Sequence, residues 1–200
     1  SITLNLALAG PQTTGGSGTD TLLQIEGLIG SSFDDTLFGN ILANQLFGRG
    51  GNDSLSAGAA DDTLDGGDGD DTLDGGTGID RASYATAGMG VEVSLLLAGS
   101  QATGGSGSDT LVLIEQLEGS AFNDSLTGDG DANLLQGLAG NDTLIGGAGN
   151  DTLEGGLGVN QLDGGAGSDR VSYANAASSV SVNLLTGAVS GGAGTDTLVS

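Results

Sequence analysis

Residues 66–74 read Gly-Gly-Asp-Gly-Asp-Asp-Thr-Leu-Asp, a nine-residue pattern that the chain repeats many times. The pattern places glycine at positions 1, 2 and 4, Asp at position 6 and Leu at position 8. A fixed short period indicates a repeat architecture, in which stacked units bury a shared core. Unbroken runs of copies cover residues 30–83 and 119–172, and isolated copies occupy residues 15–23, 104–112 and 191–199.

A longer period of 89 residues contains the short one, and it relates Gly15 to Gly104 and Tyr84 to Tyr173 without an insertion. Between the regular runs, apolar and polar residues alternate at 2–6, 91–95 and 180–184, which predicts β-strands. We interpret the chain as a segment of a longer protein. Its predicted parts are a partial strand segment at 1–14, a first unit at 15–103 with its β-roll at 30–83, a second unit at 104–190 with its β-roll at 119–172, and the start of a third unit at 191–200.

Each repeat predicts a turn followed by a short strand. Glycines adopt backbone angles that other residues avoid, so the first six residues form the turn. The last three, such as Thr72-Leu73-Asp74, form a strand whose Leu points inward. Two repeats then make one flattened coil of eighteen residues, and successive coils stack about 4.8 Å apart. No segment shows a convincing helical pattern. The predicted fold class is an all-β parallel β-roll, or β-solenoid.

This coil length stacks the Asp residues of position 6 above one another. Two bare carboxylates about 5 Å apart repel by roughly 3 kcal/mol at an effective dielectric near 20. Calcium–oxygen distances of about 2.3–2.6 Å are half the coil spacing, so one ion can bridge two turns while turn carbonyls complete its shell. We therefore expect multiple Ca²⁺ ions and a chain that is largely unfolded without them. The stacked pairs are Asp35–Asp53, Asp53–Asp71, Asp62–Asp80, Asp124–Asp142 and Asp151–Asp169.

The composition narrows the possible functions. The formal net charge is −23, and Arg49, Arg81 and Arg170 are the only basic side chains, so the chain repels nucleic acid and anionic membranes. The absence of His and Cys excludes disulfides, thiol chemistry and His-dependent triads, and we expect no enzymatic activity. No stretch approaches the ~18 apolar residues of a membrane span. The first residues lack the basic region of a secretory signal peptide.

The nonapeptide resembles the RTX repeat, the haemolysin-type calcium-binding motif, over most of residues 15–84 and 104–173. The stretches 24–40 and 113–129, in which Ile-Glu precedes a Gly-Ser…Asp-x-Leu sequence, are similar to the C-terminal β-roll domain of serralysin-type proteases. The resemblance implies a right-handed parallel β-roll, export by a type I system, and folding in calcium-rich surroundings outside the cell.

The resemblance also implies a ligand set. In that family, the carbonyls at positions 2 and 4 and the Asp of one turn join the carbonyls at positions 1 and 3 and the Asp eighteen residues on. Carried over, the sites use Arg49, Gly51, Asp53, Gly66, Asp68 and Asp71; Gly58, Ala60, Asp62, Gly75, Thr77 and Asp80; Gly147, Gly149, Asp151, Gly164, Ala166 and Asp169; and Leu138, Gly140, Asp142, Gly155, Leu157 and Asn160, with Asp35, Asn44, Asp124 and Asn133 as further ligands.

Some repeats depart from the pattern. Asn replaces Asp at Asn44, Asn133 and Asn160, which lowers the ligand charge and should weaken those sites. Ser31 and Phe33 make the first turn of a run irregular. Other features leave alternatives open: Glu26 and Glu115 are ligands at irregular sites or exposed residues. Tyr84 and Tyr173, beside Arg81 and Arg170, form a binding surface or, as we favour, a junction with the inserted strands.

Three functional hypotheses remain. We favour a non-catalytic, calcium-rigidified extender or filament unit of a secreted adhesin, surface-layer or matrix protein, which could join further copies of itself end to end. The alternative is the C-terminal secretion and folding module of a type I-secreted enzyme. The third hypothesis is an ice-binding repeat, suggested by the outward-facing Thr63 and Thr72, but Gln and Arg interrupt that ladder in the sequence.

Overall fold

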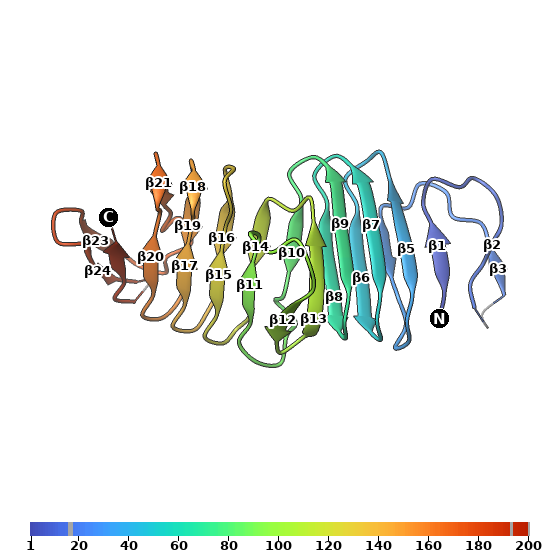
Figure 1. Ribbon diagram of the computed structural model, residues 1–200, viewed down its shortest axis with the longest axis horizontal. Helices are drawn as coiled ribbons and strands as arrows, with labels where there is room; N and C mark the ends of the chain where they lie inside the picture. The colour runs from blue at the N-terminus through green and yellow to red at the C-terminus, as the bar shows by residue number, and fades with distance from the viewer. Residues whose placement is uncertain (16–17, 193, 200) are drawn as a thin grey trace. The chain divides into compact units, whose positions relative to one another are not determined.

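The computed structural model describes residues 1–15, 18–192 and 194–199. The regular secondary structure within these residues consists of β-strands (Figure 1). Most strands pair in parallel with a strand eighteen residues away, which stacks the coils. The predicted all-β parallel β-solenoid is therefore confirmed. Residues 16–17 of the expected copy at 15–23, and residues 193 and 200 of the expected third unit, lie outside the described residues.

The chain divides into two compact units. Unit 1 comprises residues 1–83 and 97–114, and unit 2 comprises residues 84–96 and 115–200. The chain therefore leaves unit 1 after Ser83, contributes one segment to unit 2, and returns to unit 1 before it finally enters unit 2 at Glu115.

In unit 1, consecutive strands of the regular run enter two different sheets. One sheet has the order β1-β5-β7-β9-β13-β12, and the unit 1 strands of the other have the order β4-β6-β8-β10. Strands β2 and β3 form a separate antiparallel pair. The bounds are β1 Thr3–Asn5, β2 Gln12–Thr13, β3 Thr19–Asp20, β4 Gly27–Ile29, β5 Thr36–Asn40, β6 Gln45–Gly50, β7 Ser54–Ala59, β8 Thr63–Asp68, β9 Thr72–Thr77, β10 Arg81–Ser83, β12 Gln101–Gly104 and β13 Gly107–Val112.

Unit 2 repeats this arrangement. One sheet has the order β11-β15-β17-β20-β25-β24-β23, the unit 2 strands of a second have the order β14-β16-β19-β22, and β18 pairs with β21. The bounds are β11 Glu92–Ser94, β14 Gln116–Glu118, β15 Ser125–Thr127, β16 Leu134–Gln136, β17 Thr143–Ile145, β18 Ala148–Gly149, β19 Thr152–Glu154, β20 Gln161–Asp163, β21 Ala166–Gly167, β22 Arg170–Val171, β23 Val180–Asn183, β24 Ala188–Gly191 and β25 Thr197–Val199.

The Leu of position 8 forms the core, as the pattern predicts. Leu55 lies opposite Leu37 and Leu73 in unit 1, and Leu144 lies opposite Leu126 in unit 2, so the core is a stack of leucines. All five are at most 1% exposed. Each coil thus removes apolar surface from water against the coils before and after it, and no coil is stable alone.

The strands of unit 1 extend further than the sequence predicts. β6 to β9 each continue through the first residues of the following repeat, so Gly58 pairs with Gly76 and Ala59 with Thr77. In unit 2 the ladder is interrupted after three residues, and its continuation survives as the short β18–β21 pair. Positions 1 to 3 therefore pair with the neighbouring coil as well as turning the chain.

No helix occurs in the part of the chain that the structure describes, and so none is long and apolar enough to cross a membrane.

The Leu stack predicts a clear difference between inward and outward leucines. Leu64 is 0% exposed and Leu42 is 53% exposed within the same unit. Replacement Leu64→Ala should lower the free energy of unfolding in calcium by about 2–5 kcal/mol, because it leaves a cavity in the core. Leu42→Ala should change it by less than about 0.5 kcal/mol. Urea denaturation of both variants in saturating calcium checks this, and equal midpoints would contradict the inward assignment.

Candidate calcium sites in the turns

The acidic residues of position 6 lie buried in the turns, at the places where the chain passes from one sheet to the other. Asp53, Asp62, Asp71, Asp142 and Asp151 are each at most 3% exposed. Charged groups are seldom buried unless they are paired, so their surroundings decide how the turns are stabilised.

One oxygen of each of these carboxylates holds the preceding coil. The backbone N–H of Asp53 donates to Oδ1 of Asp71 over 2.7 Å, and the N–H of Asp124 donates to Oδ1 of Asp142 over 2.9 Å. The same bond recurs eighteen residues apart along both sides of each unit. Stacked position-6 residues are therefore joined by an amide–carboxylate hydrogen bond, which satisfies a buried amide that no strand pairs.

This geometry explains the glycine at position 1. A Cβ placed on Gly48 would clash with Oδ2 of Asp53, and one on Gly66 would clash with Oδ2 of Asp71. The carboxylate of each repeat thus folds back over the first residue of its own turn. Glycine leaves room for it, although Ala57 occupies the same position in the repeat that contains Asp62.

The second carboxylate oxygen separates two kinds of turn. At the first turn of each run, Oδ2 of Asp35 accepts the hydroxyl of Ser31 over 2.8 Å, and Oδ2 of Asp124 accepts the backbone N–H of Ser120 over 2.7 Å. The Ser120 hydroxyl donates to the other oxygen of Asp124. In the interior turns, Oδ2 of Asp53, Asp62, Asp71, Asp142 and Asp151 is buried and accepts no hydrogen bond. A buried carboxylate oxygen without a donor is costly, and calcium prefers oxygens of this type. The interior turns therefore fit calcium.

Burial raises the pKa of these carboxyl groups. The pKa of Asp53 and of Asp62 rises to about 6, and the pKa of Asp71 and of Asp142 rises to about 7, with loss of solvation as the largest cause. Backbone N–H donors oppose this rise, and neighbouring carboxylates such as Asp109, beside Asp71, add to it. The protein alone thus disfavours the charge on these groups, which is the condition that a bound cation relieves.

The Asn turns are satisfied without a cation. The Nδ2 group of Asn44 donates to the Glu26 carbonyl over 3.3 Å, and that of Asn133 donates to the Glu115 carbonyl over 3.2 Å. Oδ1 of Asn44 also accepts the N–H of Asn40 over 2.7 Å. An Asp in place of either Asn would bring a carboxylate oxygen against the Glu carbonyl, and the two oxygens would repel each other. Glu26 and Glu115 therefore meet these turns through their main chain.

The ligand sets implied by the resemblance lie on adjacent coils in register. Gly51 donates its N–H to the Asp68 carbonyl over 3.0 Å, and Ala166 donates to the Gly147 carbonyl over 2.8 Å. The Leu138 carbonyl accepts the N–H of Leu157 over 2.8 Å. Several of the proposed carbonyl ligands thus already accept one hydrogen bond, and a carbonyl has a second lone pair for a metal.

The last turn of the second run, which contains Asp169, is more exposed than the interior turns. Asp169 is exposed, although its Oδ1 accepts the N–H of Asp151 over 3.0 Å. Within the described residues, no three acidic side chains converge on one point. A stacked pair brings at most two carboxylates together, so backbone carbonyls must supply the remaining ligands.

Position 5 carries a second ladder that sequence reasoning missed. Oδ1 of Asp34 accepts the N–H of Asn52 over 2.9 Å, and Oδ1 of Asn52 accepts the N–H of Asp70 over 3.1 Å. The direction is opposite to that of the position-6 ladder, since here the later coil donates. The same bond joins Asn123 to Asn141. The available signal was the frequency of Asp and Asn at position 5, because a short side chain that accepts a hydrogen bond is required there.

The hydroxyl residues do not fall in the order that the sequence suggests. In unit 1 the two sheets separate alternate repeats, so the interrupting Gln45 and Arg81 lie with Thr63 in one sheet. The expectation that Gln and Arg interrupt the ladder holds for the sheet that contains Thr63 and fails for the sheet that contains Thr72. Its flanking row is mixed and includes Phe38 and Asp74, so it offers a single hydroxyl row and no uniform surface. The row consists of Thr3, Thr36, Ser54, Thr72 and Thr110.

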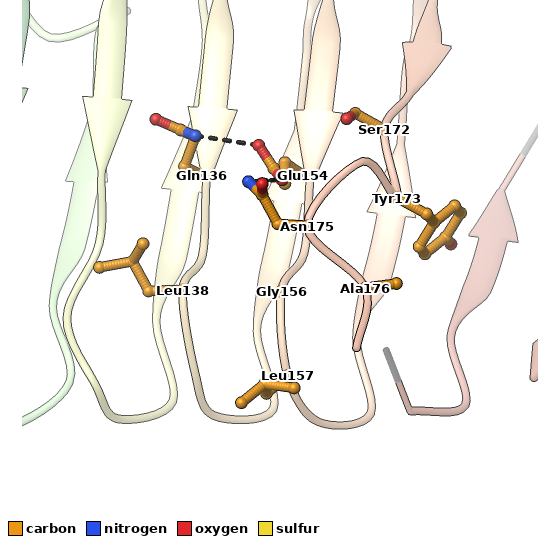
Figure 2. Close-up of a pocket in the computed structure, with 9 residues that line it drawn as sticks. All are labelled: Gln136, Leu138, Glu154, Gly156, Leu157, Ser172, Tyr173, Asn175 and Ala176. Atoms are coloured by element: carbon orange, nitrogen blue, oxygen red, sulfur yellow. Dashed lines mark hydrogen bonds between the residues drawn. The ribbon is translucent and has the colours of Figure 1, made fainter. Parts of the chain in front are cut away.

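In unit 2, the segment that contains Tyr173 lies over the outer face of β16 and β19 (Figure 2). Asn175 donates to Oε1 of Glu154 over 2.6 Å, and Gln136 donates to its Oε2 over 2.9 Å. These bonds fasten the segment to the sheet beside a cavity of about 130 Å³. Burial, followed by the negative charge of Asp196, raises the pKa of the Tyr173 hydroxyl.

The fold and the turns together define a β-solenoid in which the turns contain buried carboxylates suited to bind calcium. The family model of the RTX calcium-binding nonapeptide repeat (4 copies) matches residues 47–82, 114–144 and 136–171. These stretches are RTX repeats that bind calcium, so the predicted family and cofactor are confirmed. No curated protein matches the chain significantly.

Replacement Asp71→Asn should separate the two roles of the carboxylate. The amide keeps an oxygen for the N–H of Asp53 but removes a ligand charge, so calcium affinity should fall by about tenfold or more. Asp70→Asn is the matched control, because Asn52 already performs the same position-5 role. Calorimetric calcium titration compares the two variants, and an equal loss in both would contradict the assignment.

The raised pKa values predict opposite effects of pH with and without calcium. The folded-state pKa values of about 6 to 7 exceed the ordinary value of 3.8. Metal-free folding is therefore favoured at acidic pH, and this stabilisation is lost as the pH rises through about 6 to 7. Calcium requires ionised carboxylates, so its affinity falls as the pH drops through the same range. Chelated protein should thus give more β signal in circular dichroism at about pH 5 than at about pH 8, whereas the calcium midpoint should be lower at the higher pH.

Proposed function

We propose that this chain is a non-catalytic structural segment that calcium folds and stiffens outside the cell. RTX repeats form a calcium-binding structural solenoid, so membership of the family supports the calcium-binding and structural parts of this proposal. The observation that carries the proposal is the set of buried interior carboxylates, such as Asp53 and Asp142, whose Oδ2 atoms have no donor. These groups are present in both units.

Calcium would lie between stacked interior turns. Asp53 with Asp71, Asp62 with Asp80, and Asp151 with Asp169 would supply the carboxylates, together with turn carbonyls. The bound ion supplies positive charge that offsets the repulsion within each pair and coordinates the oxygens without donors. The chain's own groups fix the spacing, because the amide–carboxylate bonds hold neighbouring coils in register.

The finer role that we favour is an extender or filament unit of an adhesin, surface layer or matrix. Two observations support it. The 89-residue unit occurs twice with the same buried ladder, and the buried acidic groups of that ladder hold neighbouring coils in register. Repeating units of one design suit a rod, whose length grows by addition of units. Such a rod would join copies of itself end to end.

The rival role is a C-terminal folding module of an enzyme that a type I system exports. Calcium-dependent folding serves this role equally, because the unfolded chain passes through the exporter and folds outside. A catalytic domain in the same polypeptide would favour the rival, whereas many further 89-residue units would favour the extender.

Removal of calcium tests the shared basis of both roles. In excess chelator at about pH 8, the β signal in circular dichroism should largely disappear and the radius of gyration should rise. Calcium should restore both, and magnesium should restore them less, since it prefers a smaller octahedral shell. A full β signal in chelator, with calcium binding absent by calorimetry, would overturn the proposal.

A further inference from the structure

The cavity beside Tyr173 lies on the outer face of unit 2, under the segment that follows β22. It has a volume of about 130 Å³, and its walls come from β16, β19, the turns that follow these strands, and residues 172–176 (Figure 2). Pockets that hold whole drug-sized molecules usually measure about 300–1,000 Å³. This cavity therefore suits a single side chain or a group of similar size.

The charged group of the cavity is the Glu154 carboxylate, which two amides hold in place. Asn175 donates its Nδ2 group to Oε1 over 2.6 Å, and Gln136 donates its Nε2 group to Oε2 over 2.9 Å. Each carboxylate oxygen has a further lone pair for a ligand. Because these two donors already fix the carboxylate, a ligand does not have to order it on binding.

The lining offers acceptors to a ligand rather than cations. Gln136 turns its nitrogen to Glu154 and its oxygen away from it (Figure 2), and that oxygen is buried without a hydrogen bond. The side chains described around the cavity include no Lys, Arg or His. An ammonium group has three donors and no acceptor, so it complements such a lining. The net charge of −23 also attracts a cation to this surface.

The opposite wall of the cavity is apolar. Leu138 and Leu157 contribute exposed side chains to it, and Ala176 closes it on the side of the overlying segment. Leu138 has a φ of 69°, in the left-handed region that Gly147 and Gly156 occupy at the same position of their repeats. This conformation is unfavourable for leucine, so the turn accepts strain and presents an apolar side chain to the cavity.

This combination of residues is particular to unit 2. In the 89-residue period, Phe47 stands at the place of Gln136, and Arg49 stands at the place of Leu138. The equivalent place in unit 1 thus lacks one amide donor and carries a positive charge. The cavity of unit 2 is therefore not a general product of the repeat.

We propose that this cavity binds the side chain of a lysine on a partner protein. The ammonium group donates to the Glu154 carboxylate, and the aliphatic stem lies along Leu138 and Leu157. Lysine commonly buries its stem against apolar surface in this way. The chain itself contains no lysine, so the partner is a different protein and not a second copy. This contact goes beyond the calcium-dependent structural role and requires only that unit 2 is folded.

Titration of the full calcium-loaded chain with a blocked lysine, Nα-acetyl-lysine N-methylamide, tests the site by nuclear magnetic resonance. The side-chain amide signals of Gln136 and Asn175 should shift saturably, with a Kd of about 1 mM, as expected for a ligand of this size. The same compound acetylated at Nε has no charge and should bind at least about tenfold more weakly. Absence of a saturable shift, or equal binding of the two compounds, would overturn the proposal.

Two variants separate this site from a general attraction of cations to an acidic chain. Glu154→Gln keeps the shape of the side chain and should weaken binding of the blocked lysine by about tenfold or more. Asp163→Asn is the matched control, because it removes one charge at the same repeat position in the other sheet of unit 2, and it should change the Kd by less than about twofold. An equal loss in both variants would overturn the site.

The β signal in circular dichroism shows whether each variant folds in calcium. The comparison of the two lysine compounds uses the unaltered chain, so it tests the site even where Glu154→Gln lowers stability. An unaltered chain that does not fold in calcium would instead overturn the proposed function.

Discussion

A single hydrogen bond recurs through both units, from the backbone N–H of one position-6 residue to the side-chain oxygen of the residue that lies above it. It fixes the distance between coils, places the core leucines opposite one another, and favours glycine at the start of the turn, as Gly48 and Gly66 illustrate. Where the acceptor is a buried carboxylate, as at Asp71, the bond also places an acidic group in the interior, whereas Asn160 accepts the N–H of Asp142 without a charge. The bond thus aligns neighbouring coils but also brings acidic groups close together, where they repel one another when ionised.

The chain resolves this conflict differently at different rungs. Hydroxyl groups of Ser31 and Ser120 serve the opening turns, and the Asn44 and Asn133 amides bond to the main chain. The interior turns contain no comparable donor. We therefore expect calcium dependence to be concentrated in the later turns of each run, whereas protein groups alone serve the first two turns. Because neighbouring turns share each ion and each core contact, we expect the later turns to respond to calcium together.

The period of the sequence was sufficient to predict the coil, the inward leucines and the stacking of position 6, since these follow from spacing alone. It was insufficient to predict which atoms meet. The sequence suggested that an ion alone joins the stacked carboxylates. It did not predict that Oδ1 of Asp71 accepts the backbone N–H of Asp53. The ladder at Asn52 was missed because it depends on the direction of a side chain across two coils. The hairpin of residues 180–191 was missed because the equivalent residues 2–6 and 91–95 pair in parallel with the following run, and pairing between distant segments decides the outcome.

The amide–carboxylate bond closes over very different lengths of chain. Its partners are 18 residues apart at Asp53 and Asp71, 33 at Ile2 and Asp35, 36 at Asn160 and Asp196, and 38 at Asp71 and Asp109. Extra residues are thus accepted between rungs, where they form hairpins or detours, although a single residue added within a turn would shift both ladders at once. This gives the architecture a rule for changing its length in evolution or engineering. Foreign segments can be grafted near the exposed residues 96–100 and 184–186, while the nine-residue repeats have to be gained or lost as whole coils.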